Sequence, residues 1–300
     1  MLCIVICHFQ QAYDSKWAWV FNVGVQLFLA LSGWLYGNKN ITDWGKWCKD
    51  KIYKLYVPYI VYVLSIFVVY RLFSIDTFTI KNLVIYIFDA QWILGYVNGL
   101  SHLWFMTAIA LCYILTPFLQ YVRNKGYVSV SLLFLSCIGV LNIFVFHLYM
   151  NVFSCLFMYV FSYLFVSLPL LSKRVCVVCL VGIFSYLLYI IDWQVLLDYS
   201  NGVNKLFHIL LAFLCVVLPI GISNRSKMVK VPSSLSWFDR NSYYIYLTHH
   251  VFILGPLSLA FYTLHKVINI GIVIVLTLLS TFFLKLLTGA ILSKLKNIKL

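Results

Sequence analysis

The sequence predicts an all-α integral membrane protein with about ten transmembrane helices in one bundle. Its 300 residues are 63% hydrophobic and only 10% charged, which is too little polar surface for a soluble domain. Apolar runs of roughly 17 to 25 residues recur, and each can cross a hydrocarbon core about 30 Å thick as a helix. A transmembrane β-barrel would show short alternating segments instead. We therefore expect a single transmembrane domain over residues 1–300.

The first apolar segment is shorter than a membrane-spanning helix. Nine residues, M-L-C-I-V-I-C-H-F, precede the polar stretch Q-Q-A-Y-D-S-K. This is about half of the roughly 20 residues that a crossing needs. We expect the outer half of a truncated first helix, with Met1 inside it and the true start upstream.

Nine complete spans are expected after this segment. Segment 83–97 is also apolar, but Asp89 and Gly95 interrupt it, so we expect it to be interfacial or re-entrant. The expected spans are 17–36, 56–73, 102–118, 127–146, 152–171, 175–191, 206–222, 241–264 and 268–289.

The distribution of positive charge gives an orientation. Segments predicted to be cytoplasmic hold 16 of the 22 Lys and Arg residues, and predicted outer segments hold five, Lys205 among them. Cytoplasmic loops of membrane proteins carry such an excess. We therefore expect a multi-pass protein of the plasma membrane with both termini in the cytoplasm. The lipid bilayer, rather than nucleic acid, accounts for the net charge of +14.

Cysteines and acidic residues indicate neither disulfides nor a metal site. Cys176 and Cys179 form a C-x-x-C inside an apolar span, without a second pair or a nearby His. A zinc site needs more ligands than this pair supplies. The eight Asp residues are scattered, and there is no Glu.

His8 is an ionisable residue in the first apolar segment. Such residues face the bundle interior or a wet cavity, because lipid leaves an imidazole without hydrogen-bond partners. One interpretation is a histidine at the outer interface. The other is a general base or a nucleophile, since imidazole works near neutral pH.

The stretch S-Y-Y-I-Y-L-T-H-H forms a second polar group. Helical geometry puts Ser242, Tyr246 and His249 on one face, with His250 about 100° away. A structural hydrogen-bond network and a functional polar site fit this pattern equally well.

The stretch S-H-L-W-F-M places His102 and Trp104 at the outer end of a span, with Asn98 just before it. Residues of these kinds commonly anchor a helix at the interface. They would also suit a sugar, for which Trp offers an apolar face and Asn and His offer hydrogen bonds.

Two basic segments lie between predicted spans. Aromatic and aliphatic residues alternate with lysines in W-G-K-W-C-K-D-K-I-Y-K, which fits an amphipathic helix on anionic lipid. The same lysines could bind the phosphates of a cytoplasmic cofactor. Both interpretations apply to the lysines Lys46, Lys49, Lys51 and Lys54 and to the second set, Arg225, Lys227, Lys230 and Arg240.

Five motifs in order resemble the acyltransferase-3 family of membrane proteins. His8 is similar to the family's first-helix histidine, V-Q-L-F-L-A-L-S-G-W to its F-F-x-L-S-G-F, and K-I-Y-K-L-Y-V-P-Y to its basic R-x-x-R-I-x-P-x-Y loop. S-H-L-W-F-M and S-Y-Y-I-Y-L-T-H resemble its H-L-W-F-L and S-Y-x-I-Y-L-x-H elements. The family usually has an Arg about ten residues before the histidine, and only seven residues precede His8.

The resemblance implies an acyl-CoA-dependent O-acyltransferase, with acetyl-CoA the expected donor and a lipid-linked or nascent surface polysaccharide the acceptor. His8 would act as base or acyl carrier, and Ser242, Tyr246 or His249 would orient it or polarise the carbonyl. Lys46, Lys49, Lys51, Lys54 and Arg240 would bind the CoA phosphates, and Asn98, His102 and Trp104 the acceptor. No metal is expected. The alternative is a non-enzymatic transporter or flippase for a glycan or lipid, and the sequence does not fix the oligomeric state.

Overall fold

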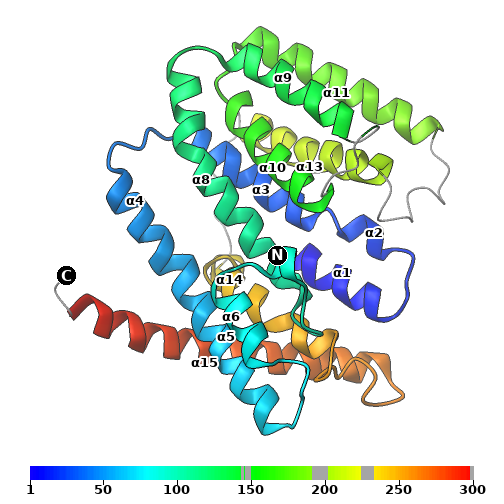
Figure 1. Ribbon diagram of the computed structural model, residues 1–300. Helices are drawn as coiled ribbons and strands as arrows, with labels where there is room; N and C mark the ends of the chain where they lie inside the picture. The colour runs from blue at the N-terminus through cyan, green and yellow to red at the C-terminus, as the bar shows by residue number, and fades with distance from the viewer. Residues whose placement is uncertain (143–144, 146–149, 191–201, 224–232, 298–300) are drawn as a thin grey trace.

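The computed structural model describes the chain except residues 143–144, 146–149, 191–201, 224–232 and 298–300. This part is helical and holds no β-strand, as the sequence predicts (Figure 1). A π-helical turn, η1 (Ile52–Tyr56), and a 3-10 turn, η2 (Ser101–Leu103), interrupt the α-helices. The α-helices are α1 (Leu2–Ala12), α2 (Ala18–Phe21), α3 (Gly24–Gly37), α4 (Trp44–Lys51), α5 (Val57–Leu72), α6 (Ile80–Ile87), α7 (Gln91–Leu94), α8 (Trp104–Asn124), α9 (Val128–Leu141), α10 (Met150–Phe165), α11 (Leu170–Ile190), α13 (Gly202–Ser223), α14 (Ser233–Ile253) and α15 (Lys266–Asn297).

Five helical stretches in the described residues are long and apolar enough to cross a membrane. The prediction of about ten spans is therefore not confirmed. α1 has 11 residues and α9 has 14, which at 1.5 Å per residue is roughly half to two thirds of a 30 Å core. The five stretches are Ala18–Gly37, Trp44–Leu72, Ser101–Asn124, Ser172–Tyr189 and Lys266–Leu295.

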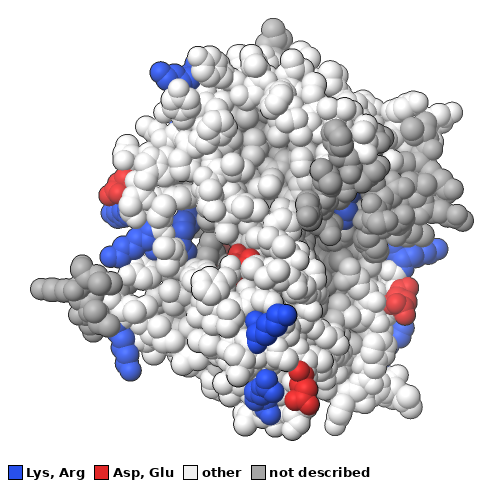
Figure 2. Space-filling view, viewed as in Figure 1, with Lys and Arg blue, Asp and Glu red and all other residues white. Residues whose placement is uncertain are grey.

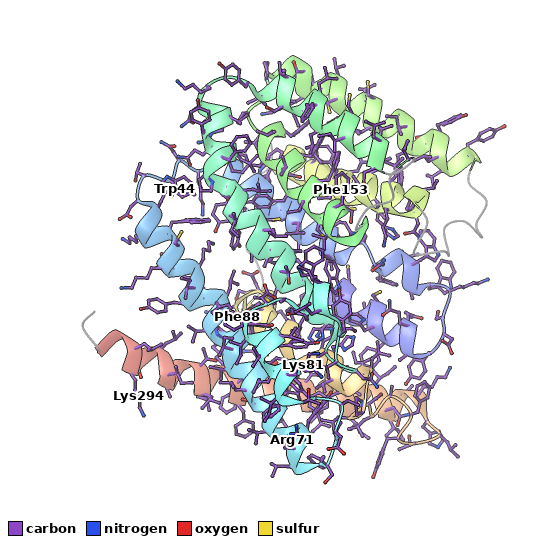
Figure 3. All side chains as sticks on the ribbon, viewed as in Figure 1. Trp44, Arg71, Lys81, Phe88, Phe153 and Lys294 are labelled. Atoms are coloured by element: carbon purple, nitrogen blue, oxygen red, sulfur yellow. The ribbon has the colours of Figure 1, made fainter. Side chains whose placement is uncertain are left out.

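The first basic segment continues directly into a membrane-spanning helix. α4, the π turn η1 and α5 form one helical stretch, Trp44–Leu72, whereas the sequence predicts a span that begins at residue 56. Asp43 starts it, because its carboxylate accepts a hydrogen bond from the backbone amide of Lys46. In Figure 3, Trp44 and Arg71 near the two ends of this stretch lie at the upper left and at the bottom of the molecule.

The prediction of a helix over 241–264 is wrong at its C-terminal end. α14 ends at Ile253, and residues 254–265 form an irregular connection to α15. Gly255 has a φ of 110°, a left-handed conformation that ends a helix, and Pro256 follows it. A helix cannot continue through such a pair, although the apolar residues after it resemble a span. The segment 83–97 contains two short helices, α6 and α7.

α3 and α10 pack with their backbones in close approach. A Cβ atom added to Gly33 would lie 2.3 Å from the carbonyl oxygen of Tyr159, and one added to Gly37 would lie 2.5 Å from that of Tyr163. Small residues four apart allow such contact between membrane helices. α13 packs on both helices, so α3, α10 and α13 form one unit beside α1 and α14.

The outer surface is mostly apolar. In Figure 2, basic side chains lie in small groups and leave wide uncharged areas between them. Large hydrophobic side chains such as Leu133 in α9 and Phe283 in α15 are about two thirds exposed. A surface of this kind suits lipid tails rather than water.

Candidate active site

Four imidazole rings from three segments meet inside the bundle. His8 lies on α1, His102 on η2, and His249 and His250 near the end of α14. The ring centroid of His8 is 4.6 Å from that of His250 and 5.3 Å from that of His249. His102 lies 4.4 Å from His250 and 5.5 Å from His249. The structure therefore brings His250, which the family motif does not require, into the same cluster as the three predicted histidines.

The backbone determines which nitrogen of three of these rings carries the hydrogen. His249 Nδ1 lies 2.8 Å from the carbonyl oxygen of Tyr246, and His250 Nδ1 lies 2.8 Å from that of Gly99. His102 Nε2 lies 3.2 Å from the carbonyl oxygen of Leu247. A carbonyl oxygen only accepts, so each of these nitrogens is the N–H donor and the other ring nitrogen has a lone pair.

His8 follows the same rule with a side-chain acceptor. Its Nδ1 lies 2.8 Å from the amide oxygen Oε1 of Gln11, one turn further along α1. Donation to this oxygen leaves Nε2 of His8 as the nitrogen with the lone pair. A neutral imidazole held in this tautomer can accept a proton at Nε2.

A cavity of about 470 Å³ opens beside the cluster. His8, His102 and His250 line it, whereas His249 is completely buried behind them. This volume is within the range of small-molecule sites. Much of the remaining wall is polar, with Gln11, Asn22, Gln26, Ser101, Trp104 and Lys205.

Neither Tyr246 nor Ser242 lines this cavity, but Tyr246 contacts a residue of its wall. The Tyr246 hydroxyl donates a hydrogen bond of 2.5 Å to the carbonyl oxygen of His102, and the Tyr246 ring lies 5.3 Å from the His102 ring. Tyr246 thus ties α14 to η2. The Ser242 hydroxyl donates to the carbonyl oxygen of Asp239 and lies one turn away from Tyr246, outside the cavity wall.

The structure places two of the three predicted acceptor-binding residues at the cavity. His102 and Trp104 line the cavity, but the exposed Asn98 does not. The backbone carbonyl of Asn98 accepts a hydrogen bond of 3.0 Å from the Tyr70 hydroxyl, which holds this loop against α5.

The predicted donor-binding lysines lie away from the cavity and have different surroundings. Lys46, Lys49 and Lys54 are exposed on α4 and η1. The Lys51 ammonium donates to the Tyr36 hydroxyl and lies 4.7 Å from the centroid of the Tyr113 ring. Aromatic faces attract a cation in this geometry.

The second predicted basic set is described only in part. Arg240 is exposed on α14, and its Nε donates to the carbonyl oxygen of Ser236. Arg225, Lys227 and Lys230 lie outside the described residues.

Asp89, which in the sequence is only an interruption of an apolar segment, anchors the segment beside η2. Its carboxylate accepts hydrogen bonds from Gln91 Nε2 at 2.8 Å and from Thr107 Oγ1 at 2.9 Å. Gln91 Nε2 also donates to the carbonyl oxygen of Leu103. Burial raises the pKa of Asp89 to about 6, because it disfavours the charged carboxylate.

Two glycines bring the end of α14 against the loop before η2. A Cβ atom on Gly255 would lie 2.4 Å from Cα of Gly99, and both residues have positive φ angles. This approach fixes the Gly99 carbonyl that accepts the hydrogen bond from His250. Two features of the sequence indicate this contact: the Gly-Pro pair after the histidine-bearing helix, and the Gly before S-H-L-W.

The comparison with known families decides the identity. The model of the acyltransferase-3 family, described as an acyltransferase domain, matches residues 1–289. The chain belongs to the acyltransferase-3 family. No curated protein and no solved structure matches the chain significantly.

Membership in the acyltransferase-3 family indicates a membrane acyltransferase, and acyl transfer to glycans is the general activity of this family. The motifs behind the predicted resemblance occupy defined places in the fold. His8, S-H-L-W and the end of S-Y-Y-I-Y-L-T-H-H meet at the imidazole cluster, whereas Gly33 of L-S-G-W lies on the face of α3 that packs on α10.

Proposed function

We propose that this protein transfers an acetyl group from cytoplasmic acetyl-CoA to a hydroxyl group of a lipid-linked or nascent cell-surface polysaccharide. The observation that carries the proposal is the position of His8. Its Nδ1 is held by Gln11, and its ring lines the cavity together with His102 and His250. A neutral imidazole next to a polar cavity is the arrangement that removes a proton from a sugar hydroxyl.

The reaction divides into two proton movements. His8 Nε2 accepts the proton of the acceptor hydroxyl as its oxygen attacks the thioester carbonyl carbon. The new C–O ester bond forms, the C–S bond breaks, and the imidazolium returns the proton to the CoA thiolate. The products are the acetylated glycan and free CoA thiol. The atoms and charges of the reaction therefore balance without an oxidant, a reductant or a metal.

The surrounding residues support this reaction in different ways. His249 does not line the cavity, and its ring lies 5.3 Å from that of His8, so it acts as a positioning residue. Tyr246 positions His102 through the backbone carbonyl. His102 and Trp104 offer the acceptor a hydrogen-bonding edge and an aromatic face.

The donor phosphates bind on the cytoplasmic side in this proposal. Exposed Lys46, Lys49 and Lys54, together with exposed Arg240 on α14, supply charge for the phosphates of CoA. Lys51 holds this segment in place through its aromatic contacts with Tyr36 and Tyr113. The thioester then extends from this surface toward the imidazole cluster.

The test uses inverted plasma-membrane vesicles that contain the protein, labelled acetyl-CoA and native lipid-linked glycan. We expect label in the glycan with the unaltered chain and with His265→Ala, an exposed histidine outside the cavity. We expect none with His8→Ala at equal membrane levels. If the glycan moves across the membrane but is never labelled, the protein is a flippase and the proposal is wrong.

A further inference from the structure

Gln26 is a buried amide residue in the wall of the cavity. It lies near the start of α3, and its neighbours in V-Q-L-F-L-A-L are all apolar. The residue belongs to the membrane-spanning stretch Ala18–Gly37 and is only 5% exposed, yet it lines the cavity together with His8 and His250. A polar amide at such a position is costly unless hydrogen bonds compensate for the loss of water.

The amide oxygen of Gln26 has no such hydrogen bond. Its Oε1 atom is buried and lacks a donor within the described part of the chain. By contrast, both ends of the amide of Gln120, a buried glutamine of α8 outside the cavity, are paired with the backbone of Ile41, each at 2.9 Å. The described contacts therefore explain a glutamine at position 120 but not at position 26.

The same cavity wall has three further acceptor atoms. His102 Nδ1, the lone-pair nitrogen of that ring, is buried and also lacks a donor among the described residues. In His8 and His250 the lone pair is on Nε2, because Nδ1 of each ring is the hydrogen-bond donor. A ligand that satisfies this wall must carry several hydrogen-bond donors, and a sugar with free hydroxyl groups does so.

The Gln26 amide can turn toward such a ligand. The last torsion of a glutamine side chain has a broad, roughly two-fold preference, so the amide can present its oxygen or its nitrogen to the cavity at little cost. Asn22, one helical turn earlier, also lines the cavity. The two amides come from the stretch that contains α2 and α3, whereas the imidazoles come from α1, η2 and α14. A sugar ring in the cavity can therefore present one hydroxyl to His8 and another to Gln26.

We propose, on the basis of the function proposed above, that Gln26 binds the acceptor sugar by accepting a hydrogen bond from a hydroxyl other than the one that receives the acetyl group. This second contact fixes the sugar ring in the cavity, so that the reacting hydroxyl lies at the imidazole cluster. Gln26 is then a specificity-determining residue, and the acceptor is a sugar with at least two free hydroxyl groups.

The experiment measures binding without acetyl-CoA, by equilibrium titration of the purified full-length protein in detergent. The probes are native lipid-linked glycan, labelled in its sugars, and the same glycan after O-methylation, which keeps the sugar oxygens but removes their hydrogens. We expect the unaltered chain to bind the native probe at least about 10-fold more tightly, since the methylated probe offers the four acceptor atoms no donor. Equal binding of the two probes, or no binding of the native one, would contradict the proposal.

Three variants show whether Gln26 makes the contact. Methionine is close to glutamine in size but is a poor acceptor, so we expect Gln26→Met to weaken binding of the native probe by about 3- to 30-fold. Gln26→Glu keeps an acceptor oxygen at the same position and should retain more of the affinity. The matched control is Gln10→Met, at a glutamine of α1 that does not line the cavity, and it should bind like the unaltered chain. Unchanged binding by Gln26→Met would overturn the proposal.

Thermal melts distinguish a binding role of Gln26 from a structural one. A buried acceptor without a donor destabilises the folded protein, whereas an apolar group of the same shape does not. We therefore expect Gln26→Met to melt at the same temperature as the unaltered chain or at a higher one, although it binds the glycan more weakly. A lower melting temperature would show that Gln26 supports the fold and would contradict the proposal.

The transfer assay separates this proposal from the proposed function. Absence of label transfer together with intact, Gln26-dependent glycan binding would contradict the acetyl transfer but leave the role of Gln26 standing. Label transfer with the same KM for the glycan in Gln26→Met as in the unaltered chain would support the acetyl transfer and contradict the role of Gln26.

Discussion

The rings of His102 and His250 stack, with centroids 4.4 Å apart and an angle of 16° between their planes. The ring of His8 meets the same His250 ring edge-on at 4.6 Å. His250 therefore lies between the predicted base and the predicted acceptor residue. Its Nδ1–H is held by the Gly99 carbonyl, so its remaining lone pair is available to the cluster.

This contact predicts that His8 and His250 act together. We expect His8→Gln to lower label transfer by about 100-fold or more and His250→Gln by about 10- to 100-fold. The double variant should lose far less than the product of the two effects, because residues in contact are not independent. The measurement is initial transfer rates in vesicles, and strictly multiplicative losses would contradict the coupling.

The exposed lysines of the α4 segment predict a salt-dependent affinity for the donor. We expect Lys46→Gln, Lys49→Gln or Lys54→Gln each to weaken acetyl-CoA binding by about 1.5- to 5-fold, as for exposed ion pairs. Added salt should reduce these differences through screening. Lys294→Gln, in the exposed last part of α15, is the control. If a variant that carries all three changes binds acetyl-CoA as tightly as Lys294→Gln does, the donor phosphates bind elsewhere.

Lys51 should behave differently from these three lysines. Its ammonium lies near the rings of both Tyr36 and Tyr113, at 4.5 Å and 4.7 Å from their centroids. We expect Lys51→Met to lower the melting temperature of the purified protein, since it removes these contacts and the hydrogen bond to Tyr36. An unchanged melting temperature with weaker donor binding would instead assign Lys51 to the donor.

Gly255 is predicted to be intolerant of a side chain. Alanine there would meet Cα of Gly99 at 2.4 Å and would have to adopt a φ of 110°. We expect Gly255→Ala to cost about 3 kcal/mol and to reduce transfer, because it displaces the carbonyl that holds His250. The matched control is Gly182→Ala on α11, where an added Cβ has no neighbour within 4 Å. Thermal melts of both variants test this, and equal melting temperatures would contradict it.

Asp89 predicts a pH-dependent stability. Its pKa is raised to about 6 in the folded protein, so the unfolded chain loses this proton at lower pH than the folded chain. The stability contributed by the protonated form is present below the unfolded pKa of about 4 and is lost as the pH rises through about 6. We expect Asp89→Asn to stabilise the protein by about 2–3 kcal/mol above that pH, and by less at pH 5.

Melting temperatures of the two proteins between pH 5 and pH 7.5 check this prediction. The difference should grow with pH and level off above about 6.5. A difference that is constant with pH would mean that the Asp89 carboxylate ionises normally in the folded protein.

The sequence predicted the helical class and the family but not the number or the ends of the helices. Hydropathy registers apolar content, so residues 254–264 resembled a span although Gly255 and Pro256 end α14 before them. α1 remains an 11-residue helix in the described chain. Composition alone does not distinguish a short buried helix from part of a crossing.

The candidate site was predictable to the extent that each residue belongs to a motif. Helical periodicity put His250 about 100° away from His249, and this is compatible with the structure, in which α14 has neighbours on both sides. α1 and η2 surround the end of α14, so both histidines reach the cluster. In the sequence, Lys205 is only one of the charges in the predicted outer segments. No local pattern reveals that a lysine near a loop lines a cavity whose other residues lie far away along the chain.

The tautomers of the four imidazoles limit how many protons the cluster can hold. One nitrogen of each ring already donates a hydrogen bond to a carbonyl or amide oxygen, so each ring can take up one more hydrogen, at the other nitrogen. The rings are so close that a second positive charge would be strongly repelled by the first. The cluster therefore has the capacity of a single base shared among four rings. In the reaction proposed above, this one proton must therefore return to the CoA thiolate before the next cycle can begin.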